Sequence, residues 1–472
     1  MKNYITKSVA IVLFITTFIS CKVSKDIEVP KDAFPENFRN VSTSNDTTSI
    51  ADLEWKNFFT EKDIIKLIDS AIAKNNDLQI ASKNIEIAQY RLTQARWGNI
   101  PEASLFVNMS TNRPSENSFN GINLNQFLNQ NHIEDYSAGI GLSWEADIWG
   151  KIRSQKKGAF TGYLQSEEVK KALQTTIVST ISKGYYNLLM LDSQLEIARK
   201  NLKLNDSTTF IIKLKYDAGQ VTSLAIQQSE AQKLIAAQLI PLLEQNIAIQ
   251  ENALSVLTGS FPSSKERTLT LNAIQLNNNL KVGIPSSLVS RRPDVKSAEL
   301  ALATANANVG ITKANLYPAL KITASGGLNS FETSNWFNIP ASLFGTALSG
   351  LTQPLLNSKK IRTQYNIAKL EREKTVLNFR QSVLVAVSEV SDALVKIEKL
   401  ERQHFFLQER VKILQQAIKN SNMLFKTGMA DYLEVITAQA NILQSELELA
   451  NIKREQLIAN IELYRSLGGG WK

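Results

Sequence analysis

The sequence predicts an α+β chain that is mostly α-helical, internally duplicated and built around very long helices, with four β-strands. Three observations support this fold class. The 472 residues include only 20 Gly and 11 Pro, about half of ordinary usage, so turns are few. Residues 355–427 contain neither glycine nor proline. One pattern of helices and strands also occurs twice along the chain. β-Propellers and dinucleotide-binding α/β folds need many more turns and are excluded.

The N-terminus has the features of a secretory signal peptide, which we predict over residues 1–20. Two lysines precede an apolar run at 9–19 that is too short to span a membrane. Ser20 precedes Cys21, the only cysteine of the chain, as at the lipid-modified cysteine of bacterial lipoproteins. The alternative is a plain signal peptide with an incidental cysteine. We predict a covalent lipid on Cys21 and a polar tether after it, within residues 21–60.

Two copies of one pattern are visible in the sequence. Residues 77–81 match residues 294–298, and residues 216–219 match residues 425–428. Each copy predicts a helix, a β-hairpin, a very long helix, a tight turn at glycine and a returning helix. The chain is therefore expected to consist of two structural repeats.

The repeats define the predicted organisation of the chain. The first repeat covers residues 61–265 and the second covers residues 291–472, with a linker at 266–290 between them. Their β-hairpins are predicted at 103–148 and 320–352. Each hairpin lies between the first helix of its repeat and the very long helix.

The strand predicted at 136–148 has the clearest alternation in the chain. Every second residue from Tyr136 to Ile148 is apolar, and the residues between them are small or charged. This period of two indicates a strand with one apolar face. The other strands are predicted at 103–111, 320–328 and 342–352, and the polar stretch at 112–135 is predicted to be a long loop.

Two very long helices are predicted at 151–217 and 355–427. At about 1.5 Å per residue, each would be roughly 100 Å long. The second carries an apolar stripe at steps of three and four, which indicates coiled-coil packing. The stripe consists of Ile397, Leu400, His404, Leu407, Val411, Leu414 and Ile418. A shorter helix is predicted at 61–97, and Pro241 is predicted to interrupt and bend the helix that follows Gly219.

The four strands have the length and alternation of strands in membrane-spanning β-barrels. Such a barrel needs about eight strands or more, so several copies of the chain would have to combine their strands. Two, three or four copies related by cyclic symmetry would suffice, and the strand pattern does not choose among them. Trp144 and Trp149 suit an aromatic belt at the membrane surface, and packing in a protein core is the alternative for both. The alternative is a soluble protein whose hairpins cap a helical bundle.

Composition argues against catalytic, metal and nucleic-acid sites. A single cysteine excludes a disulfide framework and paired-cysteine metal sites. The only two histidines, His132 and His404, are far apart in the sequence, which argues against histidine-rich metal catalysis and a Ser-His-Asp triad. The sequence contains no phosphate-binding loop and no HExxH zinc motif, so we predict neither an enzyme nor a cofactor. The net charge of +9 is assigned to solvated helix faces, some near anionic head groups, and we predict no nucleic-acid partner. The densest basic stretch contains Lys151, Arg153, Lys156, Lys157, Lys170 and Lys171.

Several stretches carry a resemblance to a known family. They are Leu-Ser-Trp-Glu-Ala-Asp-Ile-Trp-Gly-Lys-Ile-Arg at 142–153, Arg-Arg-Pro-Asp-Val at 291–295, Leu-Tyr-Pro at 316–318 and Leu-Tyr-Arg-Ser-Leu-Gly-Gly-Gly-Trp at 463–471. With these stretches, the glycine turns and Cys21, the chain resembles the TolC/OprM family of outer-membrane efflux channels, in its NodT-type lipoprotein branch. The resemblance covers nearly all of the mature chain.

The resemblance implies a homotrimer in the outer membrane. The strands of three chains would form a 12-stranded transmembrane β-barrel, and their long helices would form a periplasmic α-barrel beneath it. Residues before 60, the 266–290 linker and the C-terminus would form an equatorial domain around the helices. The implied function is the passive exit duct of a tripartite efflux pump, in which a periplasmic adaptor joins the duct to an inner-membrane transporter.

The resemblance also assigns site residues. The tips of the two helical hairpins would contact the adaptor, and the residues concerned are Gly219, Leu224, Gly428 and Leu433. Asp431 and Glu434 are candidates for the pore aperture, because the family often has aspartates just after the second glycine turn. Thr437 stands where the family commonly has a further aspartate. The alternative for both acids is an exposed helix start, where they offset the helix macrodipole.

Two other functions remain open from the sequence. One is a type I protein-secretion channel of the outer membrane, and the other is a non-conducting coiled-coil scaffold in the periplasm. A periplasmic adaptor would normally have one helical hairpin and no duplicated amphipathic strands. The cysteine at position 21 and the Gly-Gly-Gly-Trp ending favour the efflux branch.

Overall fold

A computed structural model describes residues 49–275, 282–283, 285–357 and 359–472. The predicted signal peptide at 1–20, Cys21 and the tether as far as residue 48 lie outside the described residues. The chain divides into two compact units, and each unit contains segments from both sequence repeats.

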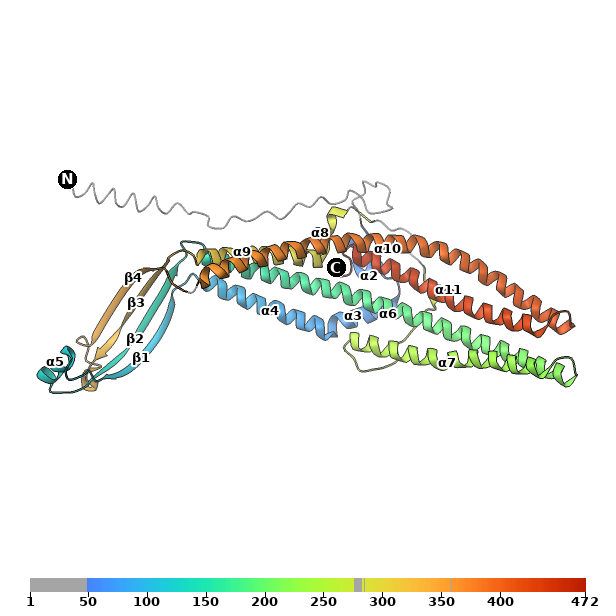
Figure 1. The fold of residues 1–472 in the computed structure, drawn as a ribbon, viewed down its shortest axis with the longest axis horizontal. Helices are drawn as coiled ribbons and strands as arrows, with labels where there is room; N and C mark the ends of the chain where they lie inside the picture. The colour runs from blue at the N-terminus through green and yellow to red at the C-terminus, as the bar shows by residue number, and fades with distance from the viewer. Residues whose placement is uncertain (1–48, 276–281, 284, 358) are drawn as a thin grey trace. The chain divides into compact units, whose positions relative to one another are not determined.

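The first unit contains residues 86–164 and 300–377, and it includes a four-stranded antiparallel sheet (Figure 1). The strands lie side by side in chain order, and all four lie where the sequence predicted strands. They are β1 Glu102–Asn112, β2 Ile133–Ala146, β3 Ala319–Ser330 and β4 Leu343–Thr352. The pairing of β2 with β3 joins the two sequence repeats in one sheet.

One face of the sheet is apolar and exposed. The register aligns Leu105 with Ile140 and Leu142 with Ala324, so apolar side chains of neighbouring strands share this face. Leu105 is 79% exposed and Ile140 is 57% exposed. The other face carries mostly small and charged side chains. Among the described residues, the outer edges of β1 and β4 pair with no further strand. The sheet therefore leaves an apolar surface and two backbone edges uncovered.

Two aromatic rings interrupt the polar face. Phe106, Gly139, Gly327 and Phe344 lie in one row across the four strands. The centroids of the two phenyl rings are 6.4 Å apart, and the two residues between them have no side chain. A Cβ atom at Gly327 would lie 2.1 Å from the carbonyl oxygen of Ala138. The backbones of β2 and β3 thus approach here more closely than a side chain would allow.

The prediction of a long loop between the first two strands was wrong in part. Helix α5, Phe119–Leu128, lies within it, at the end of the sheet away from the long helices (Figure 1). The Ser118 hydroxyl accepts a hydrogen bond from the Gly121 amide at 3.1 Å and caps the helix. Asn129 ends the helix in the left-handed conformation. The polar composition of the segment concealed these two local signals.

Two very long helices lie close to the predicted ranges, although the second begins at Lys360 and not at residue 355. Helix α6 covers Lys151–Asp217 and α10 covers Lys360–Thr427. The remaining long helices are α4 Asn76–Trp97, α7 Ser223–Leu257, α9 Pro293–Ala314 and α11 Tyr432–Ser466. Short helical segments are η1 Ile50–Asp52, α2 Trp55–Phe58, η2 Leu271–Ala273, η3 Pro285–Ser287, α8 Leu288–Arg291 and η4 Thr333–Asn335. In the described part of the chain, no helix has the length and apolarity needed to cross a membrane.

The prediction of one helix over 61–97 was wrong at Asn75. This residue separates α3, Lys62–Lys74, from α4. The Asn75 side-chain oxygen accepts a hydrogen bond from the Asp77 amide at 2.9 Å, and its nitrogen donates to the Leu257 carbonyl at 2.9 Å. Asn75 therefore starts α4 and fixes it to the end of α7.

The prediction that Pro241 interrupts its helix was also wrong. Helix α7 continues through Pro241, although a proline within a helix removes one backbone hydrogen bond and costs about 3 kcal/mol. Leu243, two residues further on, is buried in the hydrophobic core, and Leu239 and Ile240 pack against that core. This packing offsets the missing bond.

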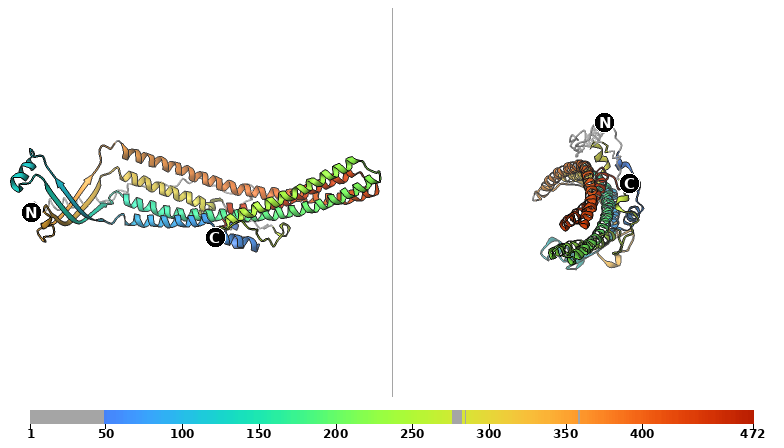
Figure 2. Two further views of the ribbon diagram at one scale, coloured as in Figure 1. Left: turned by 90° about the horizontal axis from the view of Figure 1, so that it is seen from below. Right: turned by 90° about the vertical axis from the view of Figure 1, so that its right-hand side faces the viewer.

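The second unit consists, where described, of residues 49–85, 165–299 and 378–472. In this unit α6 with α7, and α10 with α11, form two helical hairpins (Figure 2). The predicted stripe of α10 packs inward: Leu407 and Val411 are buried, and the other stripe residues are partly buried. Burial, together with the charge of Lys453, lowers the pKa of His404 on this stripe.

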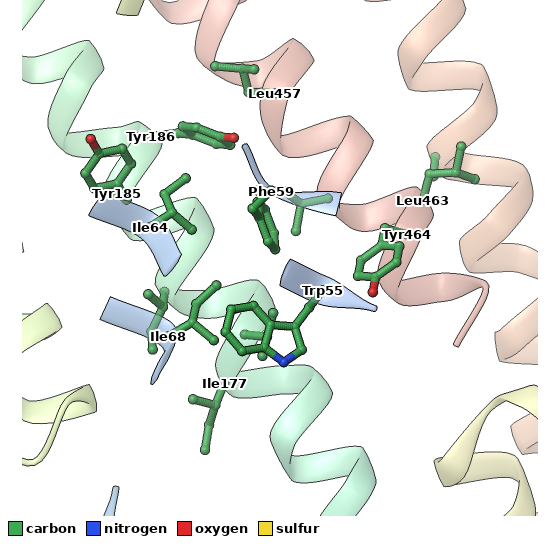
Figure 3. Packing of buried hydrophobic residues seen from close by; sticks show 14 of the residues in the cluster. Trp55, Phe59, Ile64, Ile68, Ile177, Tyr185, Tyr186, Leu457, Leu463 and Tyr464 are labelled. Atoms are coloured by element: carbon green, nitrogen blue, oxygen red, sulfur yellow. The ribbon is translucent and has the colours of Figure 1, made fainter. Parts of the chain in front are cut away.

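The main hydrophobic core lies in the second unit (Figure 3). Ile64 of α3 and Tyr185 of α6 have no exposed surface. The Phe58 ring stacks on Tyr464 of α11 with the ring centroids 4.0 Å apart. The Tyr464 hydroxyl donates a hydrogen bond to the Leu53 carbonyl at 2.7 Å. The first described helices are thereby attached to the last helix of the chain.

Candidate functional site

Two tight turns end the helical hairpins of the second unit. Gly219, between α6 and α7, has φ +72°, and Gly428, between α10 and α11, has φ +79°. The Gln220 amide donates to the Lys215 carbonyl at 2.8 Å, and an equivalent bond of 2.8 Å closes the second turn. No atom lies within 4 Å of a Cβ built on either glycine. The backbone conformation, and not the available space, is what requires glycine here.

A small apolar cluster joins the two hairpins beneath the turns. Ile212, Ala225, Phe425 and Val435 come from α6, α7, α10 and α11, and none is more than 3% exposed. The Lys215 ammonium lies 2.5 Å from the Phe425 carbonyl oxygen and 4.2 Å from the centroid of the Phe425 ring. One lysine of α6 therefore satisfies a carbonyl at the end of α10. Both turns lie at the same end of the unit (Figures 1 and 2).

The side chains that surround the turns are exposed. Leu224 and Leu433, at the starts of α7 and α11, are 52% and 53% exposed. Asp431 and Glu434 are exposed as well. The Asp431 carboxylate accepts a hydrogen bond from the Tyr432 amide at 2.6 Å and so caps α11, while Glu434 lies in its first turn. The structure thus brings the predicted tip residues and both acids to one end of the unit.

A buried polar ladder between the hairpins was not predicted from the sequence. Gln439 of α11 is completely buried, and its amide donates to the Thr208 hydroxyl of α6 at 2.7 Å. Asn205 donates to the side-chain oxygen of Asn201 at 2.7 Å, and Asn201 donates to the Gln439 carbonyl at 3.4 Å. The spacing of the three α6 residues is helical and could have indicated a polar stripe.

The ladder is incomplete. The side-chain oxygen of Gln439 has no hydrogen-bond partner among the described residues. A buried polar atom without a partner costs about 1–3 kcal/mol. The contact between α6 and α11 is therefore weaker here than apolar packing would make it.

Ion pairs align the helices within the first hairpin. Lys213 of α6 lies 2.7 Å from Glu230 of α7, and Lys233 of α7 lies 2.6 Å from Asp206 of α6. The hydrogen bond from Lys213 and its charge lower the pKa of Glu230. Both pairs are about half exposed, and exposed pairs of this kind add little stability.

The arrangement of this end of the unit suits contacts with another protein. It presents exposed leucines and carboxylates around two tight turns. In the described ranges, no three His, Cys, Asp or Glu side chains are grouped closely enough to hold a metal ion.

Comparison with known proteins identifies the family. Residues 67–260 and 284–469 match the family described as outer membrane efflux protein. The chain is 27% identical to the cation efflux system protein CusC of Escherichia coli O6:H1, over 96% of each chain. It is 26% identical to the probable outer membrane lipoprotein SilC of Salmonella typhimurium, over 90% of this chain and 89% of SilC.

Solved structures agree with this match at the level of the fold. The structure of the open state of the MtrE outer membrane channel of Neisseria gonorrhoeae has a TM-score of 0.84 with this chain. The two chains are 24% identical, over 96% of this chain and 99% of MtrE. The family match extends over most of both sequence repeats and confirms the resemblance seen in the sequence. The chain therefore belongs to the outer membrane efflux protein family.

Proposed function

We propose that this chain is the outer-membrane exit duct of a tripartite efflux system, through which small molecules leave passively. Membership of the outer membrane efflux protein family supports this function. The names of its relatives support it as well, since they describe CusC as part of a cation efflux system and MtrE as an outer membrane channel. The duct has a large helical part in the periplasm, performs no catalysis and needs no cofactor.

The observation that carries the proposal is the unfinished sheet of the first unit. In the part of the chain that the structure describes, its edge strands β1 and β4 pair with no further strand, and one of its faces is apolar. Pairing β1 of one copy with β4 of the next would satisfy both edges. Three copies in a ring would then form a 12-stranded barrel with its apolar face toward lipid.

The proposal includes a division of the chain around the duct. Residues 1–20 are a signal peptide, and the lipid on Cys21 anchors the tether within 21–60. The name of SilC, probable outer membrane lipoprotein, supports this anchor. The linker at 266–290 contributes with the C-terminus to an equatorial domain. The two repeats are residues 61–265 and 291–472.

The tips of the helical hairpins are the proposed docking surface for a periplasmic adaptor. The adaptor would connect the duct to an inner-membrane transporter, which supplies the energy for export. Exposed Leu224 and Leu433 provide apolar contacts, and they lie close to the tight turns at Gly219 and Gly428. A homotrimer would present three copies of each tip to its partner.

Channel recording tests the proposed function directly. The full-length chain, purified in detergent, is expected to form a homotrimer and to give ion currents in planar lipid bilayers. A monomer that stays in solution without detergent and gives no current would support the periplasmic scaffold instead. Co-purification with a secreted protein and its transporter, without a periplasmic efflux adaptor, would support a type I secretion channel.

The two acids after the second turn give a further test. Asp431→Asn with Glu434→Gln is expected to reduce the preference of the open pore for cations. A cation about 6 Å from one carboxylate gains roughly 0.7 kcal/mol in water, which is about threefold in occupancy. Asparagine still caps the helix, so the fold should be retained. Glu401→Gln, exposed on α10 about 40 Å from the turn, is the matched control. Unchanged currents in the double variant would show that neither acid lines the aperture.

A further inference from the structure

The junction between the sheet and the long helices of the first unit is strongly basic. Four segments meet there, and they contain eleven Lys and Arg residues against three Asp and Glu residues. The opposite end of the sheet has the reverse balance, with one Arg against four acids in its two loops. The junction segments are 91–102, 145–157, 311–321 and 352–363, and the loops are 110–136 and 328–343. The charge of this unit is therefore separated between the two ends of its sheet.

Two of the three acids at the junction are already engaged. Glu145 lies 2.9 Å from the Lys151 ammonium. Asp147 accepts hydrogen bonds from two backbone amides at the start of α6, each at 2.9 Å. Arg153 and Lys156 are exposed and have no acidic partner among the described residues. Within the described residues of the unit, these two cations therefore have no counter-charge.

The geometry of α6 determines on which side of the sheet these cations lie. Lys151 lies on the side of the polar face, because its partner Glu145 belongs to that face. At about 100° per residue, Arg153 lies about 200° around the helix from Lys151, and Lys156 lies about 140° from it. Both cations consequently lie on the side of the apolar face.

Aromatic side chains lie between the apolar strands and these cations. Trp144 is on the apolar face of β2, and its indole donates to the Asn99 carbonyl at 3.0 Å. The Trp149 ring stacks on Tyr317 with centroids 4.8 Å apart, and its indole donates to the Pro318 carbonyl at 2.8 Å. The order of apolar strand, aromatic ring and cation matches the order of acyl chain, interface and charged head group in a lipid leaflet.

We propose that this junction surface, formed by Trp144, Trp149, Arg153 and Lys156, binds anionic phospholipid head groups of the membrane leaflet that faces the periplasm. The inference rests on the proposed function, because it requires the apolar face of the sheet to lie in the outer membrane. Each cation near an anionic lipid surface strengthens binding by about fivefold at low salt. The junction surface would therefore fix the height of the sheet in the membrane.

Brominated lipids, which quench tryptophan fluorescence on contact, test the inference on the full-length chain in detergent. The wild-type protein is expected to bind brominated phosphatidylglycerol at least about fivefold more tightly than brominated phosphatidylcholine, and added salt should reduce this preference. Arg153→Gln with Lys156→Gln should reduce the preference by at least about fivefold. Arg153→Lys with Lys156→Arg should retain it, because both charges remain.

A matched control lies on the same helix. Lys200→Gln with Lys203→Gln removes two exposed cations about 70 Å further along α6 and should leave the preference unchanged. A wild-type protein without the preference, a double variant that retains it, or full competition by millimolar inorganic phosphate would each overturn the inference. Planar-bilayer currents from the same preparations separate the two hypotheses. A conducting protein without lipid preference contradicts only this inference, whereas a protein that does not insert contradicts the proposed function as well.

Discussion

Replacing Arg292 by methionine is expected to lower the free energy of unfolding of the second unit by about 2–4 kcal/mol. The Arg292 side chain is 4% exposed. Its guanidinium donates to Asp294 at 2.6 Å, to Glu389 of α10 at 2.7 Å and to the Ser466 carbonyl of α11 at 3.1 Å. Its Nε also donates to the other Asp294 carboxylate oxygen at 3.0 Å. Methionine removes all four bonds. The expected loss is smaller than for a completely buried ion pair, because half of the Asp294 side chain is exposed.

The pH dependence distinguishes the loss of this network from a simple loss of packing. Burial raises the pKa of Asp294, but the hydrogen bonds and charge of Arg292 outweigh it, so the pKa lies below its ordinary value of 3.8. A carboxylate whose pKa is lowered by folding stabilises the folded state above its ordinary pKa, and this stabilisation is lost as the pH falls through the folded value. The difference in the free energy of unfolding between wild type and variant should therefore be largest near neutral pH and become smaller below pH 3.8.

Urea unfolding of the full-length chain, followed by far-ultraviolet circular dichroism, measures both effects. Arg410→Met removes an exposed ion pair with Glu448 and should cost less than about 1 kcal/mol. If both variants lose the same free energy of unfolding, the role given to Arg292 is contradicted. If the loss in the Arg292 variant stays constant into the acid range, missing packing alone explains it.

The long elements could be predicted from the sequence because their signals are local. The absence of glycine and proline predicts α10, and the strict alternation between Tyr136 and Ala146 predicts β2. In α10 the absence of helix breakers, and in β2 the alternation of apolar residues, extends over many successive residues. The order of the elements and the two glycine turns followed from the same local signals.

Features that depend on distant contacts could not be predicted in this way. Asn75 ends α3 because its side chain reaches Leu257, which is 182 residues away. Gln439 is buried because α11 packs against Thr208 of α6, and Arg292 is buried because Glu389 and Ser466 converge on it. A polar residue in the sequence does not reveal which distant group will form a hydrogen bond with it.

Gly327→Ala is expected to disrupt the sheet of the first unit, at a cost of more than about 3 kcal/mol. The new Cβ atom would lie 2.1 Å from the Ala138 carbonyl oxygen and 2.5 Å from the Gly139 Cα. Both atoms belong to the backbone of β2, so a change of side-chain rotamer cannot relieve the overlap. The strands β2 and β3 would have to separate at the pairing that joins the two sequence repeats.

Hydrogen exchange of peptides from β2 and β3 in the full-length chain measures this separation without reference to transport. The Gly327→Ala variant should lose protection in both strands, and it should also form fewer oligomers if these strands belong to the proposed barrel. Gly345→Ala, in β4 of the same sheet, has no atom within 4 Å of the new Cβ and should be neutral or slightly stabilising. The close approach at Gly327 would be refuted by equal protection in the two variants, because only one of them places a methyl group against the neighbouring backbone.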